Sequence, residues 1–137
     1  MYRIVKRLEF CYGHRLMDYE GSCAKAHGHN GVLEVELSSA QLDPTGMVRD
    51  FGDVKEVLGR FIEQHLDHRM LLRRDDPLVE ALGSVGEEAF VMSENPTAEN
   101  IARLLFEEGR RLGLPVSAVR FWENARAMAE YRGEEEE

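Results

Sequence analysis

The sequence is poor in several features that mark whole classes of protein. Only two cysteines, Cys11 and Cys23, occur in 137 residues, which excludes a small fold held together by several disulfides. No apolar run approaches the ~20 residues of a membrane span, and the N-terminal segment lacks the apolar stretch of a signal peptide. Positive charge is also scarce, with 17 Lys and Arg against 26 Asp and Glu. The formal net charge of -9 argues against a nucleic-acid partner. We therefore expect a cytoplasmic protein that binds neither membranes nor nucleic acid.

The rest of the composition is that of a small folded domain. Hydrophobic residues make up 43% of the chain and charged residues 31%, which suits a buried core and a well-solvated surface. A chain of 137 residues fits one domain. We assign that domain to residues 1–133 and expect residues 134–137, the acidic end of "GEEEE", to form a tail.

Alternation of apolar and polar residues predicts strands with one buried face. In the clearest case His27, His29 and Leu33 share one face, while Glu34 and Glu36 lie on the other. On this criterion the predicted strands cover residues 2–14, 27–37, 116–123 and 129–132.

Apolar residues spaced three and four apart predict two long amphipathic helices. The first covers residues 51–66, with Asp50 or Asp53 as its N-cap. The second follows the stretch "ENPTAEN", in which Asn95 and Thr97 are both suitable caps.

The segment 73–93 has the weakest pattern, and we expect a short helix and a mobile loop there. Strand pairs accompanied by helices indicate an α+β fold with an antiparallel sheet.

Three histidines form a candidate metal site. Residues i and i+2 of a strand point to the same side, so His27 and His29 can bind one ion. His14 ends the first predicted strand, which could lie beside the second. Three imidazoles leave one tetrahedral zinc position free, which is typical of catalytic zinc sites. The alternative, ordinary hydrogen-bonded histidines, is less favoured by this pattern.

The role of Cys23 stays open between three interpretations. It could be a fourth metal ligand, a proton-transfer group whose pKa a nearby cation lowers, or an inert buried thiol. The neighbouring Asp67 and His68 fit a carboxylate-tuned proton shuttle. Glu123 lies on the same face of its predicted strand as the apolar Val119 and Phe121. A carboxylate there either reaches solvent at the strand end or accepts the paired N–H donors of a ligand such as a guanine or pterin edge.

Over most of its length the chain resembles the 6-pyruvoyltetrahydropterin synthase and 6-carboxytetrahydropterin synthase family. The resemblance rests on several pieces in one order: Phe10 and His14, "CAKAHGH" from Cys23, "TGMVRDF" from Thr45, "LDH" from Leu66, "NPTAEN" from Asn95, Glu123, and "YRG" from Tyr131.

The resemblance implies a fold, an assembly and a set of roles. The implied fold is the T-fold, an antiparallel sheet with two long helices packed on one face, assembled through trimers into a homohexamer with active sites between subunits. The implied roles are Zn²⁺ on His14, His27 and His29, Cys23 as proton acceptor with Asp67 and His68 as its acid–base partner, Glu123 as anchor of the pterin ring, and Thr97 and Glu99 in the pterin pocket.

The short "CAKAHGH" interval resembles the 6-carboxytetrahydropterin synthases. The activity this implies is conversion of 7,8-dihydroneopterin triphosphate to 6-carboxytetrahydropterin with release of acetaldehyde and triphosphate, a step of queuosine biosynthesis. The alternatives are triphosphate elimination alone, as in 6-pyruvoyltetrahydropterin synthase, and a zinc- or pterin-binding protein without turnover. The chain departs from the family pattern at Tyr12, usually small, at Gly31, usually aromatic, and at Asn124, often threonine.

Overall fold

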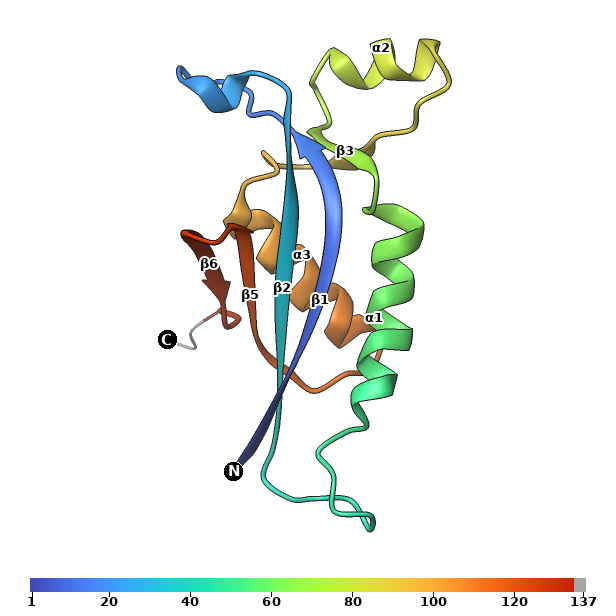
Figure 1. Cartoon of the computed structure of the whole chain (residues 1–137), viewed down its shortest axis with the longest axis vertical. Coiled ribbons are helices and arrows are strands. Elements are labelled where there is room, and N and C mark those ends of the chain that lie inside the picture. Colours follow the sequence, from blue (N-terminus) through green and yellow to red (C-terminus); the bar gives the residue numbers. More distant parts are fainter. Residues whose placement is uncertain (135–137) are drawn as a thin grey trace.

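The structure, a computed structural model, describes residues 1–134. Its elements are β1 (Tyr2–His14), the short 3-10 turn η1 (Ser22–Ala24), β2 (His27–Ser39), α1 (Phe51–His65), β3 (Arg69–Arg73), α2 (Leu78–Ser84), β4 (Phe90–Met92), α3 (Ala98–Arg111), β5 (Val116–Asn124) and β6 (Ala127–Tyr131) (Figure 1). The predicted α+β class and the four predicted strands are confirmed. Of the expected tail, Glu134 is described, and residues 135–137 lie outside the described part of the chain.

The six strands form one sheet in the order β4-β3-β1-β2-β5-β6. β1 and β2 pair antiparallel along their whole length, from Tyr2 opposite Ser39 to His14 opposite His27. β5 and β6 continue the sheet antiparallel. The sheet is mixed, however, because β3 pairs parallel with β1 and β4 pairs parallel with β3. Our expectation of a purely antiparallel sheet missed these two short strands.

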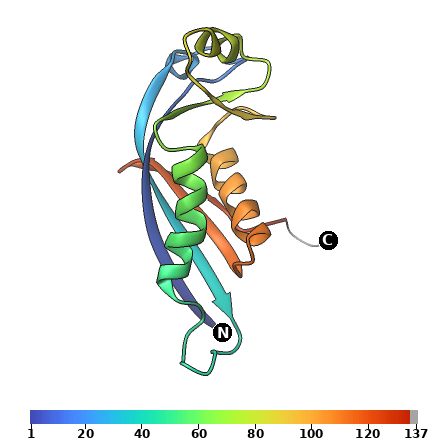
Figure 2. The ribbon, with the colours of Figure 1, turned by 90° about the vertical axis from the view of Figure 1, so that its right-hand side faces the viewer.

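The two long helices, α1 and α3, lie against one face of the sheet (Figure 2). Asp50 caps α1 by accepting from the amide of Gly52 at 2.7 Å, and Thr97 caps α3 by accepting from the amide of Asn100 at 3.1 Å. The core between helices and sheet is fully buried and includes, as its largest members, Leu33, Leu37, Leu58, Ile101, Leu105 and Phe121.

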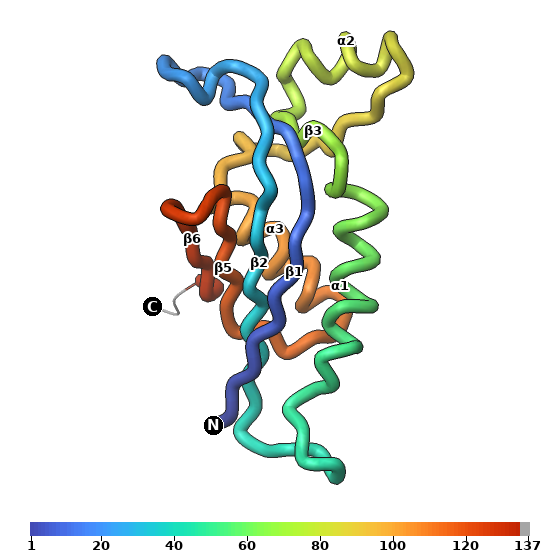
Figure 3. Tube along the Cα trace, in the orientation of Figure 1, coloured from blue at the N-terminus to red at the C-terminus, as the bar shows by residue number. Residues whose placement is uncertain are grey.

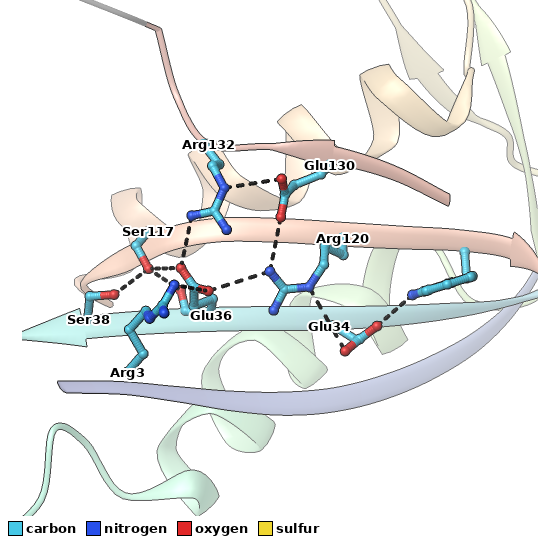
Figure 4. A network of polar contacts seen from close by, with 9 residues as sticks. Arg3, Glu34, Glu36, Ser38, Ser117, Arg120, Glu130 and Arg132 are labelled. Carbon is cyan, nitrogen blue, oxygen red and sulfur yellow. Dashed lines mark hydrogen bonds and ion pairs between the residues drawn. The ribbon is translucent and has the colours of Figure 1, made fainter. Parts of the chain in front are cut away.

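The other face of the sheet carries charge. Glu36 is buried there, and its carboxylate accepts from the hydroxyl of Ser117 at 2.6 Å and lies within 3.5 Å of Arg120 and Arg132 (Figure 4). Burial opposes ionisation of Glu36, but the Ser117 hydrogen bond and the two guanidinium groups outweigh it and hold its pKa below the usual value. The prediction that Glu34 and Glu36 lie on the polar face of this strand is therefore correct. On that face Glu36 belongs to a network of hydrogen bonds and ion pairs.

The expected short helix in residues 73–93 is present as α2, in a segment that also contains β4. This segment, η1 and the end of β1 meet at one end of the molecule, while the loop of residues 40–50 lies at the opposite end (Figure 3). Within the described residues, no helix is long and apolar enough to cross a membrane.

Candidate metal centre and ligand cavity

The three predicted histidines come together at the end of the β1–β2 ladder. His14 lies directly opposite His27, and His29 lies two residues further along β2 on the same face. One ring nitrogen from each of the three lies within 4.8 Å of the others. The sequence pattern thus identified a cluster that can hold one metal ion.

Backbone carbonyls turn two of these rings toward a common point. Nδ1 of His14 donates to the carbonyl of Pro96 at 2.7 Å, and Nδ1 of His27 donates to the carbonyl of Lys25 at 2.6 Å. Each bond leaves the lone pair of Nε2 free, as in metal-binding histidines whose other ring nitrogen donates to a backbone carbonyl. Among the described residues, Nε2 of His14 and Nε2 of His29 are buried without a hydrogen-bond partner. Buried unpartnered nitrogens are costly, so this donor set fits a metal ion.

The charge state of His14 also suits a ligand. His14 is buried, and burial lowers the pKa of its imidazole, as does the proximity of His27 and His29, against an opposing hydrogen bond to Pro96. The lowered pKa favours the neutral ring, which is the form that binds metal.

Cys23 lies in η1, on the connection between β1 and β2. Its carbonyl accepts from the amide of Leu16 at 2.9 Å, and it is a free thiol of intermediate burial, as Cys11 is a free, exposed one. Cys23 does not belong to the group of ligand atoms formed by the histidines. Its position therefore favours neither a closed metal site nor a disulfide.

Ion pairs of Arg15 and Arg73 join the β1–β2 connection that carries Cys23 (the Cys23 connection) to the residues at and just after the end of β3. Arg15 makes a two-pronged ion pair with the buried carboxylate of Asp76, one contact being Nε to Oδ2 at 2.8 Å. Arg73 bridges Asp18 at 2.8 Å and Asp75 at 2.6 Å. The least regular part of the sequence thus supports the connection that carries Cys23. Sequence reasoning missed these partners because nothing in residues 73–76 marks them as neighbours of residues 15–18.

A cavity of about 260 Å³ joins most of the predicted site residues. Its lining includes His14, Cys23, Thr97, Glu99 and Glu123. Oε1 of Glu123 lies 3.9 Å from Nε2 of His14, and the Glu123 side chain is 24% exposed, so it faces this cavity at the edge of the core. The hydroxyl of Thr97 is engaged as the α3 cap, and Glu99 is exposed. A ligand in this cavity would contact His14 of the histidine cluster, a thiol and a carboxylate together.

The remaining predicted pair, Asp67 and His68, lies elsewhere. Nδ1 of His68 is 3.0 Å from Oδ2 of Asp67, and the other Asp67 oxygen accepts from the Cys11 amide at 3.0 Å. Burial opposes ionisation of Asp67, but these bonds outweigh it and hold its pKa below the usual value. The pair lines a separate cavity of about 690 Å³ on the β3 side of β1, which shares no lining residue with the first. The expected Asp67–His68 contact is present, but one chain does not bring it to Cys23.

The sequence comparisons identify related proteins. A family model described as 6-pyruvoyl tetrahydropterin synthase matches residues 3–134. The chain is 37% identical to the 6-carboxy-5,6,7,8-tetrahydropterin synthase of Rickettsia felis over 110 residues, 79% of this chain and 80% of that protein. It is 30% identical to the enzyme of the same name from Haemophilus influenzae over 141 residues, covering 96% of this chain and 99% of that protein.

Solved structures share the fold. An uncharacterized protein of Wolinella succinogenes superposes with a TM-score of 0.78 at 30% identity, covering 97% of this chain and 98% of that one. The 6-pyruvoyl tetrahydropterin synthase of Caenorhabditis elegans superposes with a TM-score of 0.74 at 26% identity, covering 97% and 96%. The expected T-fold is thereby confirmed.

Proposed function

The chain belongs to the 6-pyruvoyl tetrahydropterin synthase family, and from this premise we propose that it is a 6-carboxy-5,6,7,8-tetrahydropterin synthase. The proposed reaction converts 7,8-dihydroneopterin triphosphate and water to 6-carboxytetrahydropterin, acetaldehyde and triphosphate, for use in queuosine biosynthesis. The observation that carries this proposal is the cavity that places His14, Cys23 and Glu123 around one volume. The short interval between Cys23 and His27 supports this branch of the family.

Zinc is the proposed metal, held by His14, His27 and His29, because three neutral imidazoles with an open fourth position are the donor set of catalytic zinc. When bound, it supplies Lewis acidity that lowers the pKa of a coordinated hydroxyl group.

The chain's own side chains then divide the remaining work. Glu123 accepts the paired N–H donors of the pterin edge and so fixes the ring relative to the histidines. Thr97 and Glu99 form part of the wall against which the ring lies. Cys23, which lines the same cavity as His14, accepts a proton from the substrate's carbon side chain.

The second proton-transfer group comes, in our proposal, from a neighbouring copy of the chain. Asp67 holds the imidazole of His68, and that side chain is 79% exposed, as a group that enters another subunit's site requires. β1 also leaves much of its backbone unpaired on its outer side, because β3 covers only Tyr12 to His14. Unpaired edges favour strand addition by another copy. The proposed assembly is a hexamer built as a dimer of trimers.

We also propose that the protein works in the cytoplasm as a single folded unit of residues 1–133. Cys11 and Cys23 are both free, and a reducing compartment keeps Cys23 available for proton transfer.

Product analysis tests the proposed function. Zinc-loaded protein is incubated with 7,8-dihydroneopterin triphosphate, and acetaldehyde and the pterin product are quantified, with the His27→Ala variant as the blank. We expect equal amounts of acetaldehyde and the 6-carboxy product. A pyruvoyl product without acetaldehyde would instead identify a 6-pyruvoyltetrahydropterin synthase, the name of the Caenorhabditis elegans relative. Stoichiometric zinc with no product of either kind would identify a binding protein.

A further inference from the structure

Tyr12 has a buried hydroxyl group that the fold does not use. The side chain is 2% exposed, and within residues 1–134 its hydroxyl oxygen is buried without a hydrogen-bond partner. Its ring packs at 5.1 Å from that of His14 and 5.7 Å from that of His29. Leaving such a hydroxyl unpaired in the core is energetically costly. A phenylalanine would fill the same space without that cost, so the hydroxyl calls for a role beyond packing.

Gly31 allows the Tyr12 ring to cross the sheet. A Cβ at Gly31 would lie 2.6 Å from Cζ of Phe121 and 3.1 Å from Cε1 of Tyr12. The Tyr12 ring, rooted on β1, therefore reaches over β2 at Gly31 in contact with the aromatic ring that comes from β5. The two family departures at positions 12 and 31 are thus one structural feature. A side chain at Gly31 would collide with Phe121 and crowd the Tyr12 ring.

Beyond Gly31, the next strand carries Glu123. Trp122 pairs with Val32, so Glu123 is placed next to Gly31 on the far side from β1. Tyr12 and Glu123 both approach His14: the Tyr12 ring lies 5.1 Å from the His14 ring, and Oε1 of Glu123 lies 3.9 Å from Nε2 of His14. A phenol hydroxyl can donate a hydrogen bond to a carboxylate. Within the described residues, the approach of Glu123 to His14 at 3.9 Å is its one polar side-chain contact, and it is too long for a hydrogen bond.

We propose that Tyr12 is a positioning residue that acts through Glu123: when a pterin occupies the cavity, the Tyr12 hydroxyl donates a hydrogen bond to the Glu123 carboxylate. This bond holds the carboxylate in the orientation that receives the paired N–H donors of the ring. The inference rests on the proposed function, because it assigns Tyr12 to the ring anchor of that site.

A double-mutant cycle tests the proposal by binding rather than turnover. Neopterin is titrated into zinc-loaded wild type, Tyr12→Phe, Glu123→Gln and the double variant, and zinc content and melting temperature are measured on each. Tyr12→Phe should weaken neopterin binding about 10- to 100-fold, the effect of losing a hydrogen bond to a charged group. Zinc content should not change, and the melting temperature should stay the same or rise. In the Glu123→Gln background the same change should have a clearly smaller effect, because the remaining amide oxygen is neutral and accepts a weaker hydrogen bond than a carboxylate.

Tyr131→Phe is the matched control, since it removes a hydroxyl from a tyrosine that packs on Phe106, away from the cavity lining. It should bind neopterin as wild type does. Equal factors for Tyr12→Phe in both backgrounds, or no effect in the wild-type background, would overturn the role of Tyr12 while leaving the proposed function standing. Failure of the wild type to bind neopterin would overturn both.

Discussion

The two sides of β1 present different halves of a site. On the helix-covered face, His14 is buried and its ring is turned by a backbone carbonyl toward His27 and His29. On the β3 side, the Asp67–His68 pair is formed, but the His68 side chain is 79% exposed and lines a different cavity. We call the histidine cluster the metal half of the site and the Asp67–His68 pair the acid–base half. The comparison shows which of the two one chain forms in its interior. The metal half lies within one chain, at the end of the β1–β2 ladder, with two rings oriented by the carbonyls of Pro96 and Lys25. The acid–base half faces outward, toward another copy in the proposed assembly.

Burial explains the difference. A buried nitrogen without a hydrogen-bond partner is energetically costly. The unpaired nitrogens of the histidine cluster therefore need a partner within the core, and a metal ion can be that partner. The exposed imidazole of His68 is hydrated, so the absence of a protein or ligand partner costs it little free energy. The sharpest experiments therefore remove one half at a time.

The largest expected effect is loss of the metal half. His27→Ala should reduce bound zinc from about one ion per chain to below about a tenth, because two imidazoles make a poor zinc site, and activity should become undetectable. His65→Ala is the control: this histidine is exposed at the end of α1 and should keep full metal content. Metal analysis after gel filtration measures both. Full zinc in the His27 variant would refute its assignment as a ligand.

Cys23→Ala should separate chemistry from metal binding. If Cys23 transfers protons, zinc and neopterin binding stay near wild type, because the histidines and Glu123 remain, and the rate falls by roughly 10²- to 10⁴-fold. Cys11→Ala is the control, since Cys11 is exposed and lies outside the cavity that Cys23 lines. Loss of zinc together with loss of activity would identify Cys23 as a metal ligand. A rate near that of wild type would show that the Cys23 thiol is inert in the reaction.

Subunit mixing should show where the two halves meet. Cys23→Ala and His68→Ala chains are each expected to be nearly inactive alone. When equal amounts are mixed and reassembled, about a quarter of the sites should receive both intact groups if neighbouring copies supply them. Activity should then recover to about a quarter of wild type.

The control mixture pairs Cys23→Ala with His27→Ala. Because His27 clusters with His14, and His14 lines one cavity with Cys23 of the same chain, no site in that mixture is whole, and no activity should return. Recovery in the control mixture, or none in the first, would contradict a site shared in this way.

Much of the metal half could be predicted from sequence, because it depends on local periodicity. Alternation placed His27 and His29 on one face, and the long ladder set His14 opposite. The carbonyls of Pro96 and Lys25, which orient the rings, could not be predicted, since a backbone carbonyl has no residue signature.

The remaining features of the fold and site could not be predicted because they depend on contacts between residues far apart in the sequence. β3 was missed because its apolar residues, Leu71 and Leu72, are adjacent and both buried, as in an internal parallel strand, so they do not alternate. The separation of Asp67 from Cys23 follows from which side of β1 the chain returns to after α1. The bond between Arg15 and Asp76 joins positions 61 residues apart, and only the fold reveals it.

The smallest predicted effect concerns that bond, which supports the Cys23 connection from outside the site. Asp76→Asn should lower the free energy of unfolding at pH 7 by about 1–3 kcal/mol, because Asp76 is buried and also accepts from the Leu78 amide at 2.8 Å. The matched control is Asp75→Asn, an exposed partner of Arg73, which should cost less than about 1 kcal/mol. Urea unfolding of all three proteins, with a chelator present throughout, measures the differences.

The pH dependence distinguishes a charge effect from a packing effect. The hydrogen bond from Arg15 holds the pKa of Asp76 below its usual value. The stability that ionised Asp76 contributes is therefore present above the unfolded-chain pKa of about 4, and it is lost as the pH falls through the lower pKa of the folded chain. The gap between wild type and Asp76→Asn should shrink steadily as the pH is lowered below about 4. A gap of the same size at pH 7 and in strong acid would mean that shape, and not the ion pair to Arg15, holds the Cys23 connection in place.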